Sequence, residues 1–218
     1  MAIATTGFSA QKYGYRFSNY FELSLEFDLP LIGKIDLEDL VYGLCGGMCY
    51  SALDYFYAGL TTPQQRTIPQ PDSSLHNYLW KRQLDSLRPT VLVKIMEWMV
   101  RGDADIAQLT AGREFLKLRR RLEKGQPAVL LLIRAGGLAN PTRNHQVVAA
   151  GYELDDLTRR VAIHLYDPNY PGEAPEITLS LANPSQGIDI HESTDDPLRG
   201  FFVLDYSPLK HALPRDED

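Results

Sequence analysis

The sequence "NHQVVAAGYELDDLTRRVAIHLYDPNYPG", residues 144–172, decides how the second half of this chain folds. It contains two largely apolar runs, 145–154 and 160–168, which flank the turn-forming sequence "DDLT". Two such runs around a short polar segment are typical of antiparallel strands joined by a tight turn. We therefore predict a β-hairpin whose turn is centred near Asp156.

This hairpin brings a histidine and a carboxylate together. A turn centred near Asp156 predicts that His145 lies directly opposite Asp167, with both side chains on one face of the sheet. A carboxylate beside an imidazole fixes its tautomer and supports the ring as a general base. Asn169 keeps the same face parity and is the alternate group for orienting the ring. The same face is expected to carry Val147, Ala149, Gly151, Ile163 and Leu165.

The non-functional alternative is that His145 is a histidine at the edge of a loop with an incidental acidic neighbour. A register shift of one residue would place His145 and Asp167 on opposite faces of the sheet. The sequence pattern alone does not exclude such a shift.

The rest of the chain separates into helices followed by strands. Further strands are predicted at 127–135, 176–181 and 200–206, and helices at about 45–59, 73–87, 90–102 and 105–124. Helices that precede an antiparallel sheet favour an α+β fold. We predict one domain over 1–218, in which 1–126 form a mainly helical half with an irregular N-terminal segment. In this division the sheet half covers 127–206 and the tail covers 207–218.

Both cysteines of the chain lie in "LCGGMCYSALDYFYAG", residues 44–59. Cys45 stands where the helix is predicted to begin, and unpaired N–H groups at a helix N-terminus favour a thiolate. Gly46 and Gly47 suit a backbone that approaches a ligand, and the N–H of Gly46 is a candidate oxyanion donor. Cys49 lies one turn further, on or beside the core face. The alternative is that both cysteines are inert core residues; a zinc site would need two more ligands.

Composition limits the functional classes. The chain has 218 residues and a formal net charge of −6, which does not indicate nucleic-acid binding. The basic run "KLRRRLEK" (117–124) is interpreted as the solvated face of a helix, with a docking patch as the alternative. No apolar run approaches the ~20 residues of a membrane span, and no signal peptide is evident. We expect a cytoplasmic protein without metal or cofactor, and its oligomeric state stays open.

Three motifs together resemble the papain-like cysteine peptidases. "LCGGMCYSALDYFYAG" is most similar to the Cys-Gly helix start of the bacteriocin leader-processing (double-glycine) peptidases and their relatives. "NHQVVAAGYE" resembles the histidine strand of that family, and "YDPNYPG" resembles its Asp-Pro element. The resemblance covers residues 40–60 and 127–172, with the motifs in the family's order. It implies a papain-like fold, a helical half packed against an antiparallel sheet.

The resemblance also implies an activity and assigns roles to residues. Cys45 is expected to be the nucleophile, His145 the base and Asp167 the residue that orients it, in a bacterial-type thiol hydrolase that cleaves peptides or amides. Alignment with the two-cysteine run of papain itself would nominate Cys49 instead. The family's oxyanion glutamine is replaced by Asp39, and Asn19 is a candidate to supply that amide. Two alternatives remain, an inactive papain-fold binding module and a transglutaminase-like acyltransferase.

Overall fold

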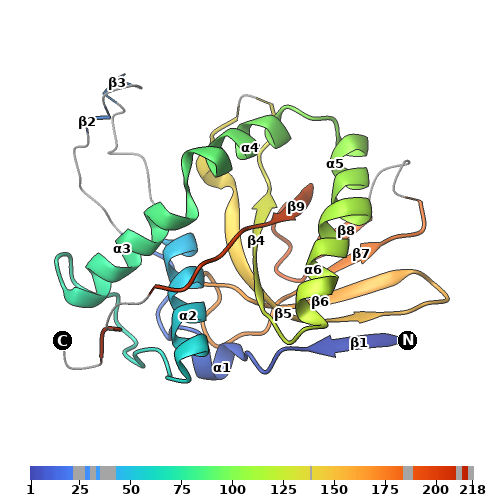
Figure 1. The fold of residues 1–218 in the computed structure, drawn as a ribbon. Coiled ribbons are helices and arrows are strands. Elements are labelled where there is room, and N and C mark those ends of the chain that lie inside the picture. Colours follow the sequence, from blue (N-terminus) through green and yellow to red (C-terminus); the bar gives the residue numbers. More distant parts are fainter. Residues whose placement is uncertain are drawn as a thin grey trace.

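The computed structural model describes residues 1–21, 28–29, 33–34, 43–137, 139–183, 189–209 and 213–215. In these ranges the chain has an α+β fold, in which helices pack against a curled antiparallel sheet (Figure 1). The predicted α+β class is confirmed. Among the described helices, none is long and apolar enough to cross a membrane.

The main sheet has seven strands in the order β8-β7-β6-β5-β4-β9, and β1 pairs with β5. The strands are β1 (Ala2–Thr5), β4 (Ala128–Ile133), β5 (His145–Leu154), β6 (Arg160–Tyr166), β7 (Glu176–Ser180), β8 (Ile190–Glu192) and β9 (Gly200–Val203). Along one edge of β5, the first half pairs with β4 and the second half pairs with β1. A separate two-stranded ladder is formed by β2 (Asp28–Leu29) and β3 (Gly33–Lys34).

Two strands of the sheet were not predicted. β8 has only three residues, too few to show a period-2 pattern. β1 lies at the start of the chain, yet it pairs with β5, which is far away in the sequence. Part of the N-terminal segment predicted to be irregular therefore belongs to the sheet, because pairing between distant strands leaves no local signal.

Apart from α1, which was not predicted, the helices follow the predicted ranges closely. They are α1 (Ala10–Tyr13), α2 (Cys45–Ala58), α3 (Ser74–Ser86), α4 (Pro89–Met99), α5 (Asp103–Leu109) and α6 (Phe115–Leu122), with a π-helical turn η2 (Thr110–Glu114) and a 3₁₀ turn η3 (Pro141–Arg143). Ser73 caps α3 by accepting a hydrogen bond from the N–H of His76. The helix predicted over 105–124 is one continuous path that η2 divides into α5 and α6.

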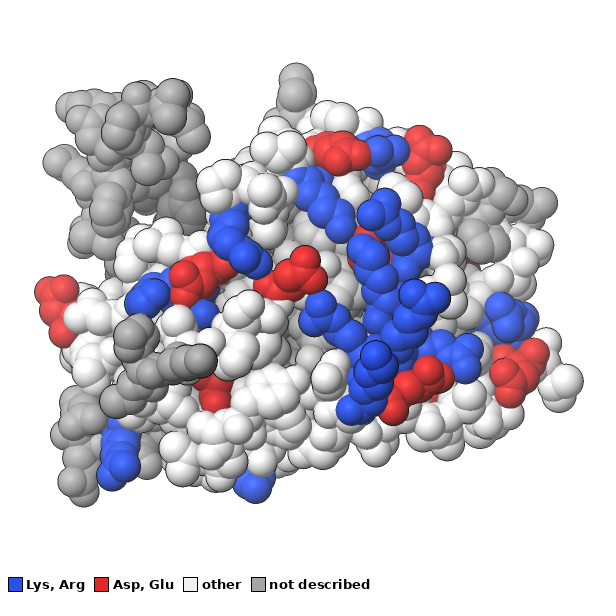
Figure 2. All heavy atoms as spheres, in the orientation of Figure 1, with Lys and Arg blue, Asp and Glu red and all other residues white. Residues whose placement is uncertain are grey.

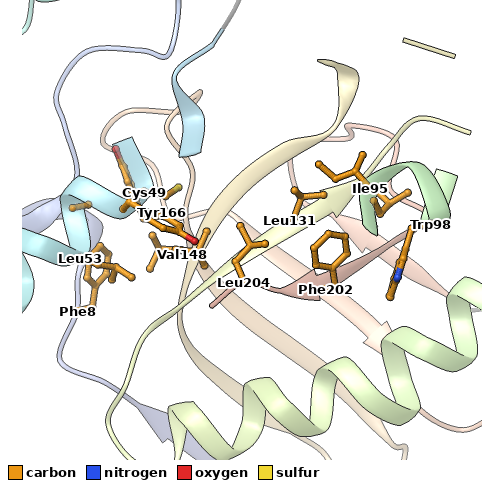
Figure 3. Packing of buried hydrophobic residues seen from close by; sticks show 14 of the residues in the cluster. Phe8, Cys49, Leu53, Ile95, Trp98, Leu131, Val148, Tyr166, Phe202 and Leu204 are labelled. Carbon is orange, nitrogen blue, oxygen red and sulfur yellow. The ribbon is translucent and has the colours of Figure 1, made fainter. Parts of the chain in front are cut away.

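Both faces of the central strands are buried. On one face, α2 and α4 pack against β4, β5, β6 and β9 through Cys49, Leu53, Ile95, Trp98, Leu131, Val148, Tyr166 and Phe202 (Figure 3). On the other face, α6 contributes Phe115, Leu118 and Leu122 to a second cluster. Burial on both sides explains why β4 reads "AVLLLI", an unbroken apolar run without polar alternation.

The hairpin register differs from the prediction. Near the turn, Leu154 pairs with Val161, and further along Val148 pairs with Tyr166, with a β-bulge between Ala149 and Gly151. Extending the second register by one residue places Val147 opposite Asp167. His145 is therefore a diagonal neighbour of Asp167, and the predicted direct pairing is wrong.

The bulge determines which side chains share a face. The register at the turn pairs odd-numbered with even-numbered residues, which would place His145 and Asp167 on opposite faces. The extra residue restores pairing between residues of equal parity, so that the two side chains share a face. The same insertion removes Gly151 from the predicted apolar face, and Tyr152 takes its place in the core.

Candidate active site

Helix α2 begins at Cys45 in a closely packed environment. A Cβ atom added to Gly47 would lie 2.1 Å from the carbonyl oxygen of Leu79, on the backbone of α3. A Cβ atom added to Gly46 would lie 2.1 Å from Oγ of Ser86 and 2.6 Å from Nε2 of Gln146. Distances of this kind leave no room for a side chain. The glycine pair therefore allows the start of α2 to approach both α3 and β5.

One of the free amides at the start of α2 has a dedicated acceptor. Oε1 of Gln83, on α3, accepts a hydrogen bond from the N–H of Gly47 at 2.8 Å. The N–H groups of Cys45 and Gly46 precede it in the first turn, where helix geometry provides no intrahelical acceptor. These two N–H groups are therefore available to an anion beside the Cys45 sulfur.

His145 connects the thiol to a buried carboxylate. Its Nε2 lies 2.7 Å from Oδ1 of Asp167, and the Cys45 side chain is near enough to the ring to help raise its pKa. Since Nε2 is used by Asp167, Nδ1 is left for the sulfur. His145 and Asp167 are both buried, and 9% of Cys45 is exposed. The structure thus brings together the three residues that the sequence predicted as catalytic.

The surroundings of His145 favour the protonated form of its ring. Burial alone would lower the pKa of His145, but the charge and hydrogen bond of Asp167, together with the Cys45 side chain, raise it to about 10. Burial alone would raise the pKa of Asp167, but the charge and hydrogen bond of His145 outweigh burial and lower it. At neutral pH we therefore expect an imidazolium between a carboxylate and a sulfur.

Asp167 is held by its own chain segment. Its Oδ1 also accepts a hydrogen bond from the backbone N–H of Asn169 at 2.7 Å. Asn169 was the alternate orienting residue, but it supports Asp167 and does not orient the ring. Oδ2 of Asp167 is buried without a hydrogen-bond partner among the described residues. The carboxylate therefore keeps one acceptor unused.

A second ionic pair lies behind Asp167. Arg134, directly after β4, donates to Oε2 of the fully buried Glu192 at 2.6 Å and lies 3.1 Å from Asp196. The charge of Arg134 helps to lower the pKa of Asp167. Burial raises the pKa of Glu192, and the negative charge of Asp167 adds to this effect. Sequence reasoning missed this pair, because its members come from two strands that are not neighbours in the sheet.

The segment before β5 is also fixed by a side chain. Oδ1 of Asn144 accepts hydrogen bonds from the backbone N–H groups of Arg134 and Ala135, at 3.0 and 3.1 Å. This contact joins the end of β4 to the residue before His145. The Asn of "NHQ" does not predict this contact from the sequence, because Asn is common in loops for many reasons.

Cys49 has a different environment. It is fully buried, and its Sγ donates a hydrogen bond to the carbonyl oxygen of Gln146 at 3.3 Å. Burial raises the pKa of the Cys49 thiol well above its usual value, and the charges of Cys45 and Asp167 add to the effect. Figure 3 shows Cys49 among the apolar side chains of the core. These properties are typical of a structural cysteine.

Asn19 lies between the two segments that carry the predicted triad. Its N–H donates to the carbonyl oxygen of Pro168 at 2.9 Å, and its Nδ2 donates to Oδ1 of Asn169 at 3.1 Å. A Cβ atom added to Gly43 would lie 2.1 Å from Nδ2 of Asn19. An amide group has two N–H donors, and this contact uses one of them. Asp39, which stands at the family's glutamine position, lies outside the described residues.

The described part of the chain contains no group of three or more His, Cys, Asp or Glu residues that could hold a metal ion. Comparisons of the chain with protein-family models, with curated proteins and with solved structures found no match.

Proposed function

We propose that this protein is a papain-like cysteine hydrolase that cleaves a peptide or amide bond through a thioester intermediate. The observation that carries the proposal is the contact between Cys45 and an imidazole that Asp167 holds at 2.7 Å. A thiol, a base and a group that orients the base are the three parts of an activated nucleophile. The papain-like fold is part of the same proposal, supported by the packing of α2 against β5 and by the order of the three motifs.

The proposed reaction begins with an ion pair. In the proposed attacking form the proton lies on the ring of His145 and the negative charge on the sulfur of Cys45. The thiolate attacks the substrate carbonyl carbon, and the carbonyl oxygen becomes an oxyanion. The backbone N–H of Gly46 and the second amide hydrogen of Asn19 are the proposed donors to this oxyanion. His145 then gives its proton to the leaving amine.

Hydrolysis completes the cycle. Neutral His145 takes a proton from water, the resulting hydroxide attacks the thioester, and the acid leaves as the thiolate reforms. Asp167 stays ionised throughout, and its role is to hold the ring through Nε2. We place this chemistry in the cytoplasm, because both cysteines are free and a reducing compartment preserves the thiol.

Alkylation with iodoacetamide tests the nucleophile directly. We expect Cys45 in the folded protein at about pH 6.5 to react on the order of 100-fold faster than Cys49, because only Cys45 contacts an imidazolium. His145→Ala should slow the reaction of Cys45 to that of an ordinary thiol. Mass spectrometry of the digested protein identifies which cysteine carries the label.

The matched control is His164→Ala, which removes a half-exposed histidine that also has a carboxylate partner, Glu176 at 2.8 Å. This variant should leave the labelling of Cys45 unchanged. Slow and equal labelling of both cysteines would contradict the proposal and favour a non-catalytic binding module. If Cys45 is reactive, product analysis of a peptide amide with and without an added amine separates hydrolysis from acyl transfer.

A further inference from the structure

A basic groove lies on the surface between α4 and α6, and it contains none of the residues of the candidate active site. Its volume is about 560 Å³, within the range of small-molecule sites. Five basic side chains and one acidic side chain line it together with apolar residues. The basic residues are Arg88, Lys94, Lys117, Arg120 and Arg121.

The two helices and the edge strand β9 form the walls of this basic groove. Lys117, Arg120 and Arg121 are spaced so that they share one face of α6. Arg88 and Lys94 come from the start and the middle of α4. Figure 2 shows Lys and Arg side chains gathered where Figure 1 draws α6.

The two carboxylates in and beneath the basic groove offset only part of the positive charge of its five basic side chains. Glu114 is fully buried beneath the groove and accepts hydrogen bonds from the N–H of Val203 and from Lys94 and Lys117. Asp205 is 89% exposed, lies 3.0 Å from Arg121, and accepts from Arg88 only through its backbone carbonyl oxygen. An ion pair so exposed contributes little.

Two of the guanidinium groups have no carboxylate among the described residues to balance their charge, although Arg88 also donates a hydrogen bond to the backbone carbonyl oxygen of Asp205 at 2.8 Å. In the described part of the chain, neither Arg88 nor Arg120 has a carboxylate partner, and Arg120 is exposed. Lys94 is only 28% exposed, and its ammonium group lies 4.1 Å from the centre of the Phe202 ring. The chain as a whole has a net charge of −6, so this local excess of positive charge contrasts with the rest of the molecule.

We propose that the basic groove binds a small polyanion, a molecule with two or more phosphate groups. Arginine side chains bind phosphate oxygens through paired N–H donors, and two such side chains face one concave space with three lysine or arginine neighbours. Nucleic acid is less well matched, because its backbone requires an extended basic track and the chain as a whole has a net charge of −6. The proposal does not depend on the reaction proposed for Cys45.

Calorimetric titration with inorganic tripolyphosphate tests this site on the full chain. The unmodified protein should bind the probe, and the double variant Arg88→Gln/Arg120→Gln should bind it at least about tenfold more weakly. The conservative variant Arg120→Lys should keep most of the affinity, because the charge remains. The catalytic variant Cys45→Ala should bind like the unmodified protein, which separates this test from the test of the proposed hydrolase.

The matched control is Lys12→Gln/Arg66→Gln, which removes two exposed cations elsewhere on the surface. Affinity that is retained in this control and lost in the groove variant supports the proposal. No binding by the unmodified protein, or equal loss in both double variants, would overturn it. Binding of a single-stranded oligonucleotide of about 20 nucleotides without binding of tripolyphosphate would overturn it in favour of a nucleic-acid surface.

Discussion

Helix α2 lies against a buried pair of an acidic and a basic side chain near each of its ends, and the two pairs differ in their residues and hydrogen bonds. At its start, Cys45 contacts His145, which pairs with Asp167 through a single carboxylate oxygen. Nearer its end, Asp54 lies 2.8 Å from Nε of Arg82. Both carboxylates are almost completely buried. The hydrogen-bond partners of each carboxylate determine the role of its pair.

Both oxygens of Asp54 are satisfied. They accept hydrogen bonds from Arg82, from the hydroxyl groups of Tyr78 and Tyr206, and from the N–H of Leu209. These contacts join α2 and α3 to the segment after β9. The donor is an arginine, which does not release its proton in this environment. This pair therefore has a structural role.

Asp167 is less completely satisfied, and its partner is a histidine. One of its oxygens has no hydrogen-bond partner among the described residues, and the imidazole can give up its proton. The difference shows how one helix carries a fixed structural ion pair at one end and a pair suited to proton transfer at the other. The two pairs are expected to differ in stability, in cysteine reactivity and in pH dependence.

The largest effect is expected from Asp54→Asn. This change removes the buried countercharge of the Arg82 guanidinium and leaves it only the partly exposed Asp85, so we expect a loss of about 3–5 kcal/mol in the free energy of unfolding. Denaturant titration followed by circular dichroism measures it. Asp85→Asn is the matched control, because Asp85 pairs with the same arginine but is 35% exposed, and it should cost less than about 1 kcal/mol. Equal losses in the two variants would show that burial does not distinguish the pairs.

A smaller effect, and on a different property, is expected from Asp167→Asn. The imidazole can lose its proton when its countercharge is removed, so the cost in stability should be modest. Alkylation of Cys45 at about pH 6.5 should slow by roughly 10- to 100-fold, because the ring loses its orientation and its charge. Asp196→Asn, one contact further out on Arg134, should change the rate by less than about twofold. An unchanged rate in Asp167→Asn would exclude a role for this carboxylate.

The smallest effect concerns pH. The pKa of His145 is raised to about 10, so its contribution to stability is complete below the unfolded pKa of about 6.5 and is lost as the pH rises towards about 10. In a Cys45→Ala background, where no neighbouring thiol can exchange a proton with the ring, the free energy of unfolding should fall by about 1 kcal/mol between about pH 6.5 and 7.5. His145→Ala should remove this dependence and His164→Ala should keep it. The same slope in His145→Ala would show that the ring is not protonated in the folded state.

The local patterns of the sequence determined much of the fold and the candidate residues of the triad, with the choice between Cys45 and Cys49 left open. The periods of the helices and strands, and the Gly-Gly pair after Cys45, depend on near neighbours in the chain and can be read without the structure. His145 and Asp167 were proposed as partners because a hairpin makes their contact local. The predicted register was nevertheless wrong by three residues at the turn and by two beyond the bulge, because the turn is centred between Leu157 and Thr158 and not near Asp156.

What only the tertiary structure decided is how distant segments meet. It placed Cys45 and not Cys49 against the imidazole, and it brought Arg134 and Glu192 together behind Asp167. It also gathered basic side chains of α4 and α6 into one groove, where the sequence showed only the solvated face of a helix. The hydrophobic periodicity of a sequence indicates which face of its own helix or strand a residue occupies. Which element covers that face depends on packing between parts of the chain that are far apart in sequence, and this packing leaves no local pattern.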